Sequence, residues 1–165
     1  MGASRDAILT ALAATRTPPE PIGGFASDAI RFADPVAAFR EALAAAGGSL
    51  ATFADRGALD RALASAEPGA VVLAGGPAVA ESGAVWWVPR SEAERRAAFL
   101  AERVIAVVAR SQLVDHLHAA YHQIDPAGAH YGCFMAGPSK TADIEQALVI
   151  GAHGPRALDV YLWEG

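Results

Sequence analysis

The sequence predicts an α/β domain with three layers, α/β/α, built around a mainly parallel sheet. Short apolar runs rich in β-branched residues, such as residues 71–73 and 104–108, alternate along the chain with segments whose apolar residues recur at helical spacing. Gly and Pro stand at most boundaries between these segments, where they end strands and helices. With 165 residues the chain can bury about 70% of its unfolded surface, so we expect one compact domain overall.

The N-terminal part of the chain divides into a helix and an arm. Residues 4–15 carry apolar side chains at helical spacing, and the Pro-rich stretch that follows cannot continue a helix. We therefore predict that residues 1–33 form an N-terminal helix and a Pro-rich arm, and that residues 34–165 form the α/β domain.

Capping residues place two helices in the first half of the domain. Asp34 precedes Pro35, a residue favoured at the first helical position, and Gly47-Gly48 stops that helix. Asp55 can cap the next helix. The predicted elements of this half are a helix from residue 34 to 47, a strand at 49–53, a helix from 55 to about 67 and a strand at 71–73.

The second half of the domain continues the alternation. Ser91 and Glu94 form a capping box that opens a helix, and Ser111 can cap a later one. Trp86 and Trp87 point to opposite faces of their strand, so both faces should be covered. The predicted elements are a strand at 84–88, a helix at 91–103, a strand at 104–108, a helix at 111–124, a strand at 131–136, a helix at 139–151 and a strand at 157–163.

The predicted helix that begins at Ser139 or Thr141 carries an unusual charge at its start. Asp143 and Glu145 lie in its first turn, where the helix dipole favours carboxylates. Lys140, the only lysine of the chain, lies at the same end, where the dipole disfavours a cation. Either the two carboxylates offset its charge, or an anionic ligand does so, held by Lys140 and the free N–H groups of the first turn.

The same stretch resembles a known family. Residues 137–155, GPSKTADIEQALVIGAHGP, closely resemble the signature of the lactate-utilisation (LUD) domain family, and in particular of its short subunit without iron–sulfur clusters. Residues 81–84 are similar to the family's Glu-Thr-Gly-Thr element, with Ala84 in place of the second Thr, and residues 110–114 to its Arg-x-Ser-Gln-Ile/Val element. The resemblance runs from about Gly75 to the end of the chain. It implies a fold like that of the sugar-isomerase and CoA-transferase superfamily.

The resemblance also implies a function. It indicates a cytoplasmic lactate-utilisation protein, acting as the cluster-free subunit of an iron–sulfur complex that oxidises L-lactate to pyruvate. On this interpretation the iron–sulfur clusters belong to partner subunits, and this chain binds no cofactor. The single cysteine, Cys133, agrees with it, because a cluster needs about four thiolates. We predict that Cys133 is a buried apolar residue rather than a reactive thiol.

The loops that follow three predicted strands should share one rim, because ligands of open α/β sheets gather at the carboxyl ends of the strands. These loops begin at Gly75, Arg110 and Gly137, and Glu81 joins them if the strand at 84–88 pairs antiparallel with the strand before Gly75. Such a pocket suits a small anionic metabolite, a carboxylate or a phosphate. The predicted ligand-binding residues are Gly75, Gly83, Gly137, Ser139, Lys140, Thr141, Asp143 and Glu145.

Glu81 is the candidate catalytic residue of this pocket. In the CoA transferases that the resemblance brings in, a glutamate is the nucleophile, so Glu81 could act as a nucleophile or as a base. A stand-alone isomerase or transferase that uses Glu81 is thus one alternative function, and a regulatory module that binds a metabolite without transforming it is another. Equally, Glu81 could be a loop carboxylate bonded to nearby N–H groups.

His153 and Gly154 lie at the far end of the predicted helix. The helical rise puts His153 roughly 15 Å from Ser139, too far for one compact site. We favour a structural role for His153 at the helix C-terminus, alongside Arg156, over a second site or a subunit contact.

Composition limits the partners. The net charge is −5 and the arginines are dispersed, which argues against nucleic acid and anionic membranes. No apolar stretch approaches the roughly 18 residues of a spanning helix, so we expect a soluble protein.

The polar run at residues 115–122, which holds three histidines, is interpreted as solvated side chains, and no metal site is predicted. The predicted partners are iron–sulfur subunits and a small anionic metabolite; a homodimer, formed through the Trp-bearing strand or the N-terminal arm, is a further hypothesis.

Overall fold

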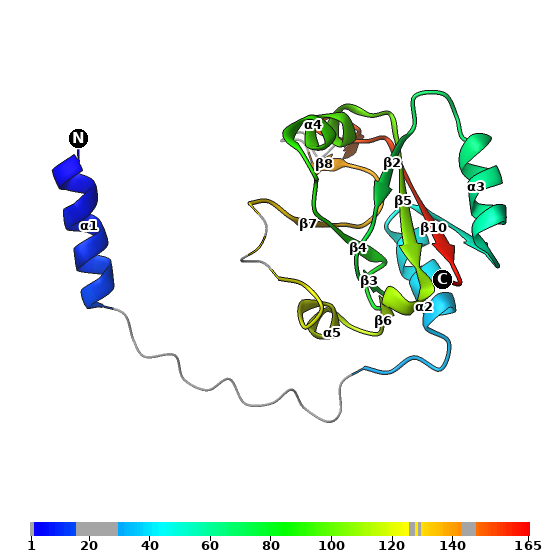
Figure 1. Ribbon diagram of the computed structural model, residues 1–165, viewed down its shortest axis with the longest axis horizontal. Coiled ribbons are helices and arrows are strands. Elements are labelled where there is room, and N and C mark those ends of the chain that lie inside the picture. The colour runs from blue at the N-terminus through cyan, green and yellow to red at the C-terminus, as the bar shows by residue number, and fades with distance from the viewer. Residues whose placement is uncertain (1, 16–29, 126–127, 129, 143–147) are drawn as a thin grey trace.

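A four-stranded parallel sheet forms the centre of the molecule (Figure 1). The computed structural model describes residues 2–15, 30–125, 128, 130–142 and 148–165. In the central sheet the strands stand in the order β1 (Ser49–Phe53), β10 (Ala157–Trp163), β5 (Arg103–Ala109) and β2 (Val71–Ala74), each parallel to its neighbour. Helices flank this sheet, so the predicted α/β class with a mainly parallel sheet is confirmed.

A second, smaller sheet lies over one face of the first. Its strands stand in the order β6 (Leu113–Val114), β3 (Ala78–Val79), β4 (Ala84–Trp87) and β7 (Cys133–Met135). The condition under which Glu81 would join the rim, antiparallel pairing of the strand at 84–88 with the strand before Gly75, is not met. The chain forms β3 after Gly76, and a tight turn returns it as β4, which pairs antiparallel with β3 and with β7.

Predicted caps begin three of the helices. Asp34, Asp55 and Ser91 each accept a hydrogen bond from a backbone N–H in the first turn of the helix that follows. The described helices are α1 (Gly2–Ala14), α2 (Pro35–Ala45), α3 (Arg56–Ala64), α4 (Glu92–Leu100), α5 (Leu117–Tyr121) and the 3-10 turn η1 (Arg110–Gln112). Most of the predicted Pro-rich arm, residues 16–29, lies outside the described residues. Within the described part of the chain, no helix has both the length and the apolar character needed to cross a membrane.

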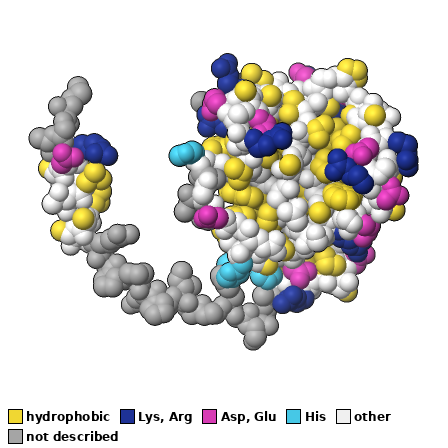
Figure 2. All heavy atoms as spheres, viewed as in Figure 1, with side chains coloured by type: hydrophobic (Ala, Val, Ile, Leu, Met, Phe, Trp, Pro, Cys, Tyr) yellow, Lys and Arg dark blue, Asp and Glu magenta, His cyan; other side chains and the backbone are white. Residues whose placement is uncertain are grey.

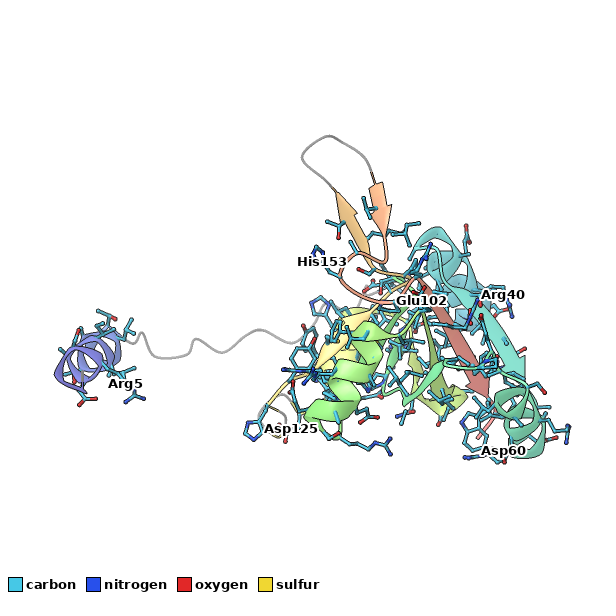
Figure 3. The ribbon with its side chains drawn as sticks, turned by 90° about the horizontal axis from the view of Figure 1, so that it is seen from above. Arg5, Arg40, Asp60, Glu102, Asp125 and His153 are labelled. Carbon is cyan, nitrogen blue, oxygen red and sulfur yellow. The ribbon has the colours of Figure 1, made fainter. Side chains whose placement is uncertain are left out.

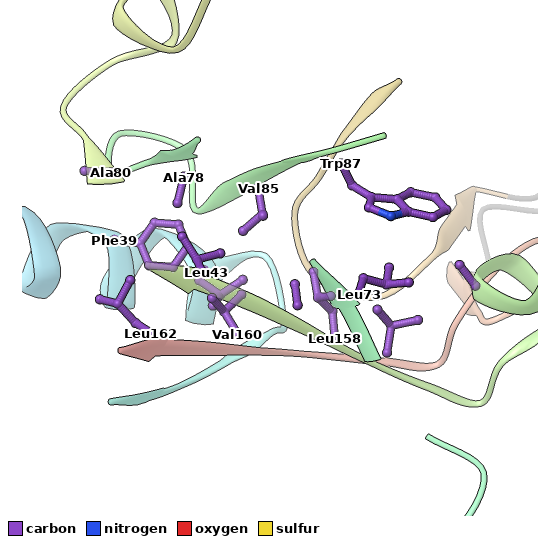
Figure 4. Close-up of a cluster of buried hydrophobic side chains, with 14 residues drawn as sticks. Phe39, Leu43, Leu73, Ala78, Ala80, Val85, Trp87, Leu158, Val160 and Leu162 are labelled. Atoms are coloured by element: carbon purple, nitrogen blue, oxygen red, sulfur yellow. The ribbon is translucent and has the colours of Figure 1, made fainter. Parts of the chain in front are cut away.

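The core lies between the two sheets, with α2 beside them (Figure 4). Phe39 and Leu43 of α2 are fully buried there. Alternate residues of β10 point into this core, and α3 covers the opposite face of the central sheet with the fully buried Leu59. The fold therefore needs apolar residues on both faces of β10 and β5, as the near-continuous apolar runs in these strands predict.

The two tryptophans of β4 behave as expected. Trp87 is only 1% exposed and faces the core, whereas Trp86 packs on the other face against Phe134 of β7, with ring centroids 4.9 Å apart. Since β4 lies between β3 and β7, both of its edges are already paired.

The predicted helix at residues 111–124 is wrong. The chain instead forms η1, then β6, then α5. Leu113 and Val114 pair in parallel with β3, and residues in a ladder cannot keep the helical backbone. A new cap, His116, then starts α5 by accepting a hydrogen bond from the Ala119 N–H through Nδ1, at 3.2 Å.

The predicted helix at residues 139–151 is also wrong wherever the chain is described. β8 (Lys140–Ala142) and β9 (Leu148–Ile150) pair antiparallel and project from the body of the molecule (Figure 3). Thr141 and Val149, both β-branched, are direct partners in this ladder, which favours strands. The helical spacing rested partly on residues 143–147, which lie outside the described residues together with the predicted site residues Asp143 and Glu145.

Candidate functional site

The segment from Gly137 to Thr141 lies at the amino edge of the central sheet. Gly137 has a φ of +70°, and a Cβ there would stand 2.8 Å from the carbonyl carbon of Ala46, at the C-terminal end of α2. Ser139 donates its backbone N–H to the carbonyl of Pro155, at 2.8 Å, just before β10 begins. The segment thus contacts the C-terminal end of α2 on one side and the loop that precedes β10 on the other.

The predicted common rim is not formed. Gly75 and Arg110 follow β2 and β5 and lie at the carboxyl edge of the central sheet, whereas Gly137 lies at the opposite edge. The reason is that the strand before Gly137, β7, belongs to the second sheet, so the rule for carboxyl ends of one parallel sheet does not apply to it.

Alternation along β8 separates the predicted anion-binding side chains. Successive residues of a strand point to opposite faces, so Lys140 points away from Thr141. The Lys140 stem reaches Gly47, where its Cε lies 3.6 Å from the position that a Cβ would take. A cation there faces the C-terminal end of α2, the end at which the helix dipole favours positive charge. Lys140 therefore has no unfavourable dipole to offset.

The other face of β8 meets His153. The Thr141 hydroxyl Oγ1 and His153 Nδ1 form a hydrogen bond of 3.2 Å, and the Ser139 side chain lies against Gly154. The predicted separation of about 15 Å between His153 and Ser139 is thus wrong, because a hairpin folds the chain back where a helix would have carried it away. The predicted cradle of free N–H groups at the first turn of a helix is not formed, since the Ser139 N–H donates to the carbonyl of Pro155 and residues 140–142 lie in a strand.

A cavity of about 230 Å³ opens beside these residues. Ser139 and His153 supply its polar side chains, and Phe99, Met135 and Leu158 supply apolar walls. None of the described residues that line it is an Asp or Glu. His153 is exposed and lies at the base of the projecting hairpin (Figure 3). The cavity can therefore accept a small molecule with an acceptor at one end and an apolar group at the other.

The apolar walls of the cavity were not predictable from the sequence. Phe99 comes from α4 and Met135 from β7, and both belong to ordinary apolar patterns of a helix and a strand. Nothing in the sequence signals that these residues meet at a cavity, because their meeting depends on how the second sheet and α4 pack.

Glu81 lies elsewhere. Its carboxylate Oε1 accepts a hydrogen bond of 2.7 Å from the Leu117 N–H at the start of α5. The side chain is exposed and borders a separate depression of about 320 Å³ together with Phe32 and Glu41. Glu81 does not line the cavity of Ser139 and His153, so the described structure does not join these predicted site residues in one pocket.

The predicted site glycines Gly75 and Gly83 each have a packing reason. A Cβ on Gly75 would lie 2.8 Å from side-chain carbons of Val85 and Val108. Gly83 has a φ of +66°, and a Cβ there would lie 2.5 Å from the Leu43 Cα in α2. Gly75 thus lets the end of β2 approach Val85 and Val108, and Gly83 lets the turn between β3 and β4 approach α2.

Cys133 lies half-buried in β7. Burial raises the pKa of its thiol, although a hydrogen bond from Tyr131 acts in the opposite direction. The thiol is therefore protonated near neutral pH and a poor nucleophile. In the part of the chain that the structure describes, no group of three or more His, Cys, Asp or Glu could hold a metal ion.

The model of the LUD domain family matches residues 36–163. Proteins named Lactate utilization protein C are similar in sequence to part of this chain. The one from Geobacillus kaustophilus (strain HTA426) is 41% identical over 83 residues, which are 47% of this chain and 35% of that protein. The one from Shouchella clausii (strain KSM-K16) is 39% identical over 82 residues, which are 47% of this chain and 36% of that protein. The match spans about a third of the length of these curated relatives.

A solved structure has a similar fold. It is a DUF162 family protein from Deinococcus radiodurans, with a TM-score of 0.56 over 78% of this chain and 96% of that chain. At 17% identity this likeness concerns the fold alone.

Proposed function

Because the chain belongs to the LUD domain family, we propose that it serves lactate utilisation, as the cluster-free cytoplasmic subunit of an iron–sulfur complex that oxidises L-lactate to pyruvate. The observation that supports this proposal most is the similarity to proteins named Lactate utilization protein C. The family match from residue 36 to 163 takes in the hairpin and its cavity.

The reaction needs redox groups, and on this proposal partner subunits hold them. Oxidation of L-lactate to pyruvate removes two electrons and two protons, and the electrons need an acceptor. The chain has one cysteine, while an iron–sulfur cluster takes about four thiolates, so the clusters that accept the electrons would be held by other subunits. This chain would contribute binding surfaces and positioning.

Exposed apolar side chains beside the hairpin support association with another subunit. Leu100 at the end of α4 is 79% exposed, and Val149 and Ile150 of β9 are 40% and 48% exposed. Leu100 borders a cavity together with Gly151, the residue after Ile150, so the α4 end and the hairpin lie near each other. Apolar side chains that gather on a surface are typical of protein contacts. Over the view in Figure 2, by contrast, Lys and Arg side chains are mixed with Asp and Glu, with no large area of one charge.

Co-purification tests the proposal. The tagged chain is expressed in its own organism grown on L-lactate, and the proteins that it retains are analysed for iron and for lactate-dependent reduction of a dye. We expect iron–sulfur proteins to be retained, and Leu100→Asp to lower their yield at least about tenfold. Val72→Asp, a matched change of an exposed apolar residue on β2 (42% exposed), should not lower it. Unchanged growth on L-lactate after deletion of the gene would contradict the proposal.

A second candidate function uses Glu81. Its carboxylate is exposed at a depression and could act as a base or nucleophile in a stand-alone isomerase or transferase. Glu81→Gln keeps an oxygen that can accept from the Leu117 N–H, so it should preserve the loop. Turnover that disappears in Glu81→Gln while ligand binding persists would favour this function, and binding without turnover in the unchanged chain would favour a regulatory module.

Light scattering of the isolated chain tests the homodimer hypothesis. Both edges of β4 are paired and Trp87 is buried, so the Trp-bearing strand offers no free edge to a second copy. A dimer would have to use another surface, such as the Leu100 region or the N-terminal part of the chain.

A further inference from the structure

We infer that the cavity of Ser139 and His153 is a binding subsite for a small monocarboxylate with a short apolar chain, of the 2-hydroxy or 2-oxo acid class. The choice of this class rests on the proposed function, and the cavity itself rests on the geometry of β8 and the loop after β9. The predicted ligand residue Lys140, on the opposite face of β8, takes no part in this subsite.

His153 is oriented for a ligand by Thr141. Their hydrogen bond uses Nδ1 of the ring, which leaves Nε2 to bind a ligand. When the Thr141 hydroxyl donates to Nδ1, the proton of the neutral ring is on Nε2, and Nε2–H can then donate to a carboxylate. The imidazolium form would donate from the same nitrogen and add a positive charge. Ser139, which lies just before β8 and lines the same cavity, supplies a hydroxyl donor.

The charges of the described lining residues do not oppose an anion. Among the described lining residues of the cavity there is no carboxylate that would repel it. Glu102 belongs to an adjoining cavity on the other side of His153, where its Oε2 lies 3.6 Å from Nε of Arg156. The charge of this carboxylate is thus shared with a cation.

The size and the apolar walls favour a small ligand. Sites for drug-sized molecules and cofactors have volumes of roughly 300–1,000 Å³, and this cavity has about 230 Å³. A nucleotide or a CoA ester could not be enclosed in it, while an acid of three or four carbons could. Phe99 and Met135 offer contacts to a methyl group or a short chain, and a phosphate would leave them unused.

Histidine-detected NMR tests the inference on the full chain. The ring resonances of the five histidines are followed while L-lactate, pyruvate, acetate or inorganic phosphate is added, and His153 is assigned by its absence in His153→Gln. We expect a saturable shift of the His153 resonance with L-lactate or pyruvate. Calorimetry should show binding weakened about tenfold in Ser139→Ala and in His153→Gln, as expected for loss of a hydrogen bond to a charged group.

Matched variants show which face of β8 binds the ligand. Ser65→Ala removes a hydroxyl that bonds within α3, so it controls for the loss of a serine hydroxyl. Its binding should equal that of the unchanged chain. Loss of binding in Lys140→Ala with none in Ser139→Ala would overturn the inference, because it would put the ligand on the opposite face of β8. Thermal unfolding of every variant shows whether the fold is kept, and Thr141→Val, which keeps the side-chain shape, provides a second test of the His153 orientation.

The ligand panel separates this inference from the proposed function. No saturable shift of His153 with any of the four probes would overturn the subsite, while co-purification with iron–sulfur proteins would still decide the function. An equal response to phosphate and lactate would overturn the ligand class. A shift with lactate in a chain that retains no iron–sulfur partner would support the subsite and contradict the proposed complex.

Discussion

Replacing Gly83 by Ala measures how closely the turn between β3 and β4 approaches α2. The residue has a φ of +66°, a conformation that costs an L-residue about 1–2 kcal/mol. In addition, the new Cβ would lie 2.5 Å from the Leu43 Cα and 2.8 Å from the carbonyl carbon of Ala42. Both atoms are backbone, so neither can rotate away, and relieving the overlap should cost about 1–3 kcal/mol more.

The expected total for Gly83→Ala is about 2–5 kcal/mol, against an overall stability of roughly 5–15 kcal/mol for a native protein. At about 2–4 °C per kcal/mol this corresponds to a fall in Tm of about 4–20 °C. Gly69→Ala is the matched control, because Gly69 also has a positive φ, +90°, but nothing lies within 4 Å of its Cβ position. It should lose only the conformational part, about 1–2 kcal/mol.

Thermal unfolding followed by circular dichroism, with urea unfolding at 25 °C, gives both values. Equal losses in Gly83→Ala and Gly69→Ala would refute the reasoning, because they would mean that α2 does not press on the turn. A much larger loss at Gly83, with ligand binding at the His153 cavity retained, would agree with a packing role for this glycine.

Three further predictions concern stability. Asp34→Ala removes the acceptor for the Val36 and Ala37 N–H groups and should lower the unfolding free energy by about 1 kcal/mol; an unchanged Tm would contradict the cap. Burial raises the pKa of the Cys133 thiol above its value in the unfolded chain, so the contribution of the neutral thiol to stability is complete below the unfolded pKa and is lost as pH rises through the folded pKa. Urea titrations should therefore show less alkaline destabilisation in Cys133→Ala than in the unchanged chain. Asp159→Asn removes the charge that pairs with Arg103, at 2.5 Å, and its destabilisation should shrink between about 0.05 and 1 M salt; a loss independent of salt would indicate hydrogen bonding rather than charge.

Local signals predicted the helices that are capped by residues close to them in the sequence. The caps at Asp34, Asp55 and Ser91 bind N–H groups only two or three residues away, so the sequence around them is sufficient. The apolar runs of β5 and β10 are long enough to indicate strands buried on both faces. The motif at residues 137–155 was likewise sufficient to indicate the family, because its residues agree in kind and order with the family signature.

The predictions failed where strands pair with distant partners. Residues 111–124 have a helical spacing, but β3 offers Leu113 and Val114 a ladder that a local pattern cannot reveal. Residues 140–150 fail in the same way, because the pairing of β8 with β9 replaces the helix at both described ends. The two errors share a cause: hydrogen bonds between strands depend on which segments meet, and helical hydrogen bonds do not.

The candidate site shows most clearly what the sequence determines and what only the tertiary structure decides. The sequence alone determined which residues carry polar chemistry, Ser139, Lys140, Thr141 and His153, and that one short stretch holds them all. Only the tertiary structure decided which of them meet. The period of two along β8 turns Lys140 toward α2 and Thr141 toward the opposite face, where the hairpin brings His153 to it across twelve residues of chain. A helix would have grouped the same side chains differently, because its period is 3.6 and its rise separates its ends.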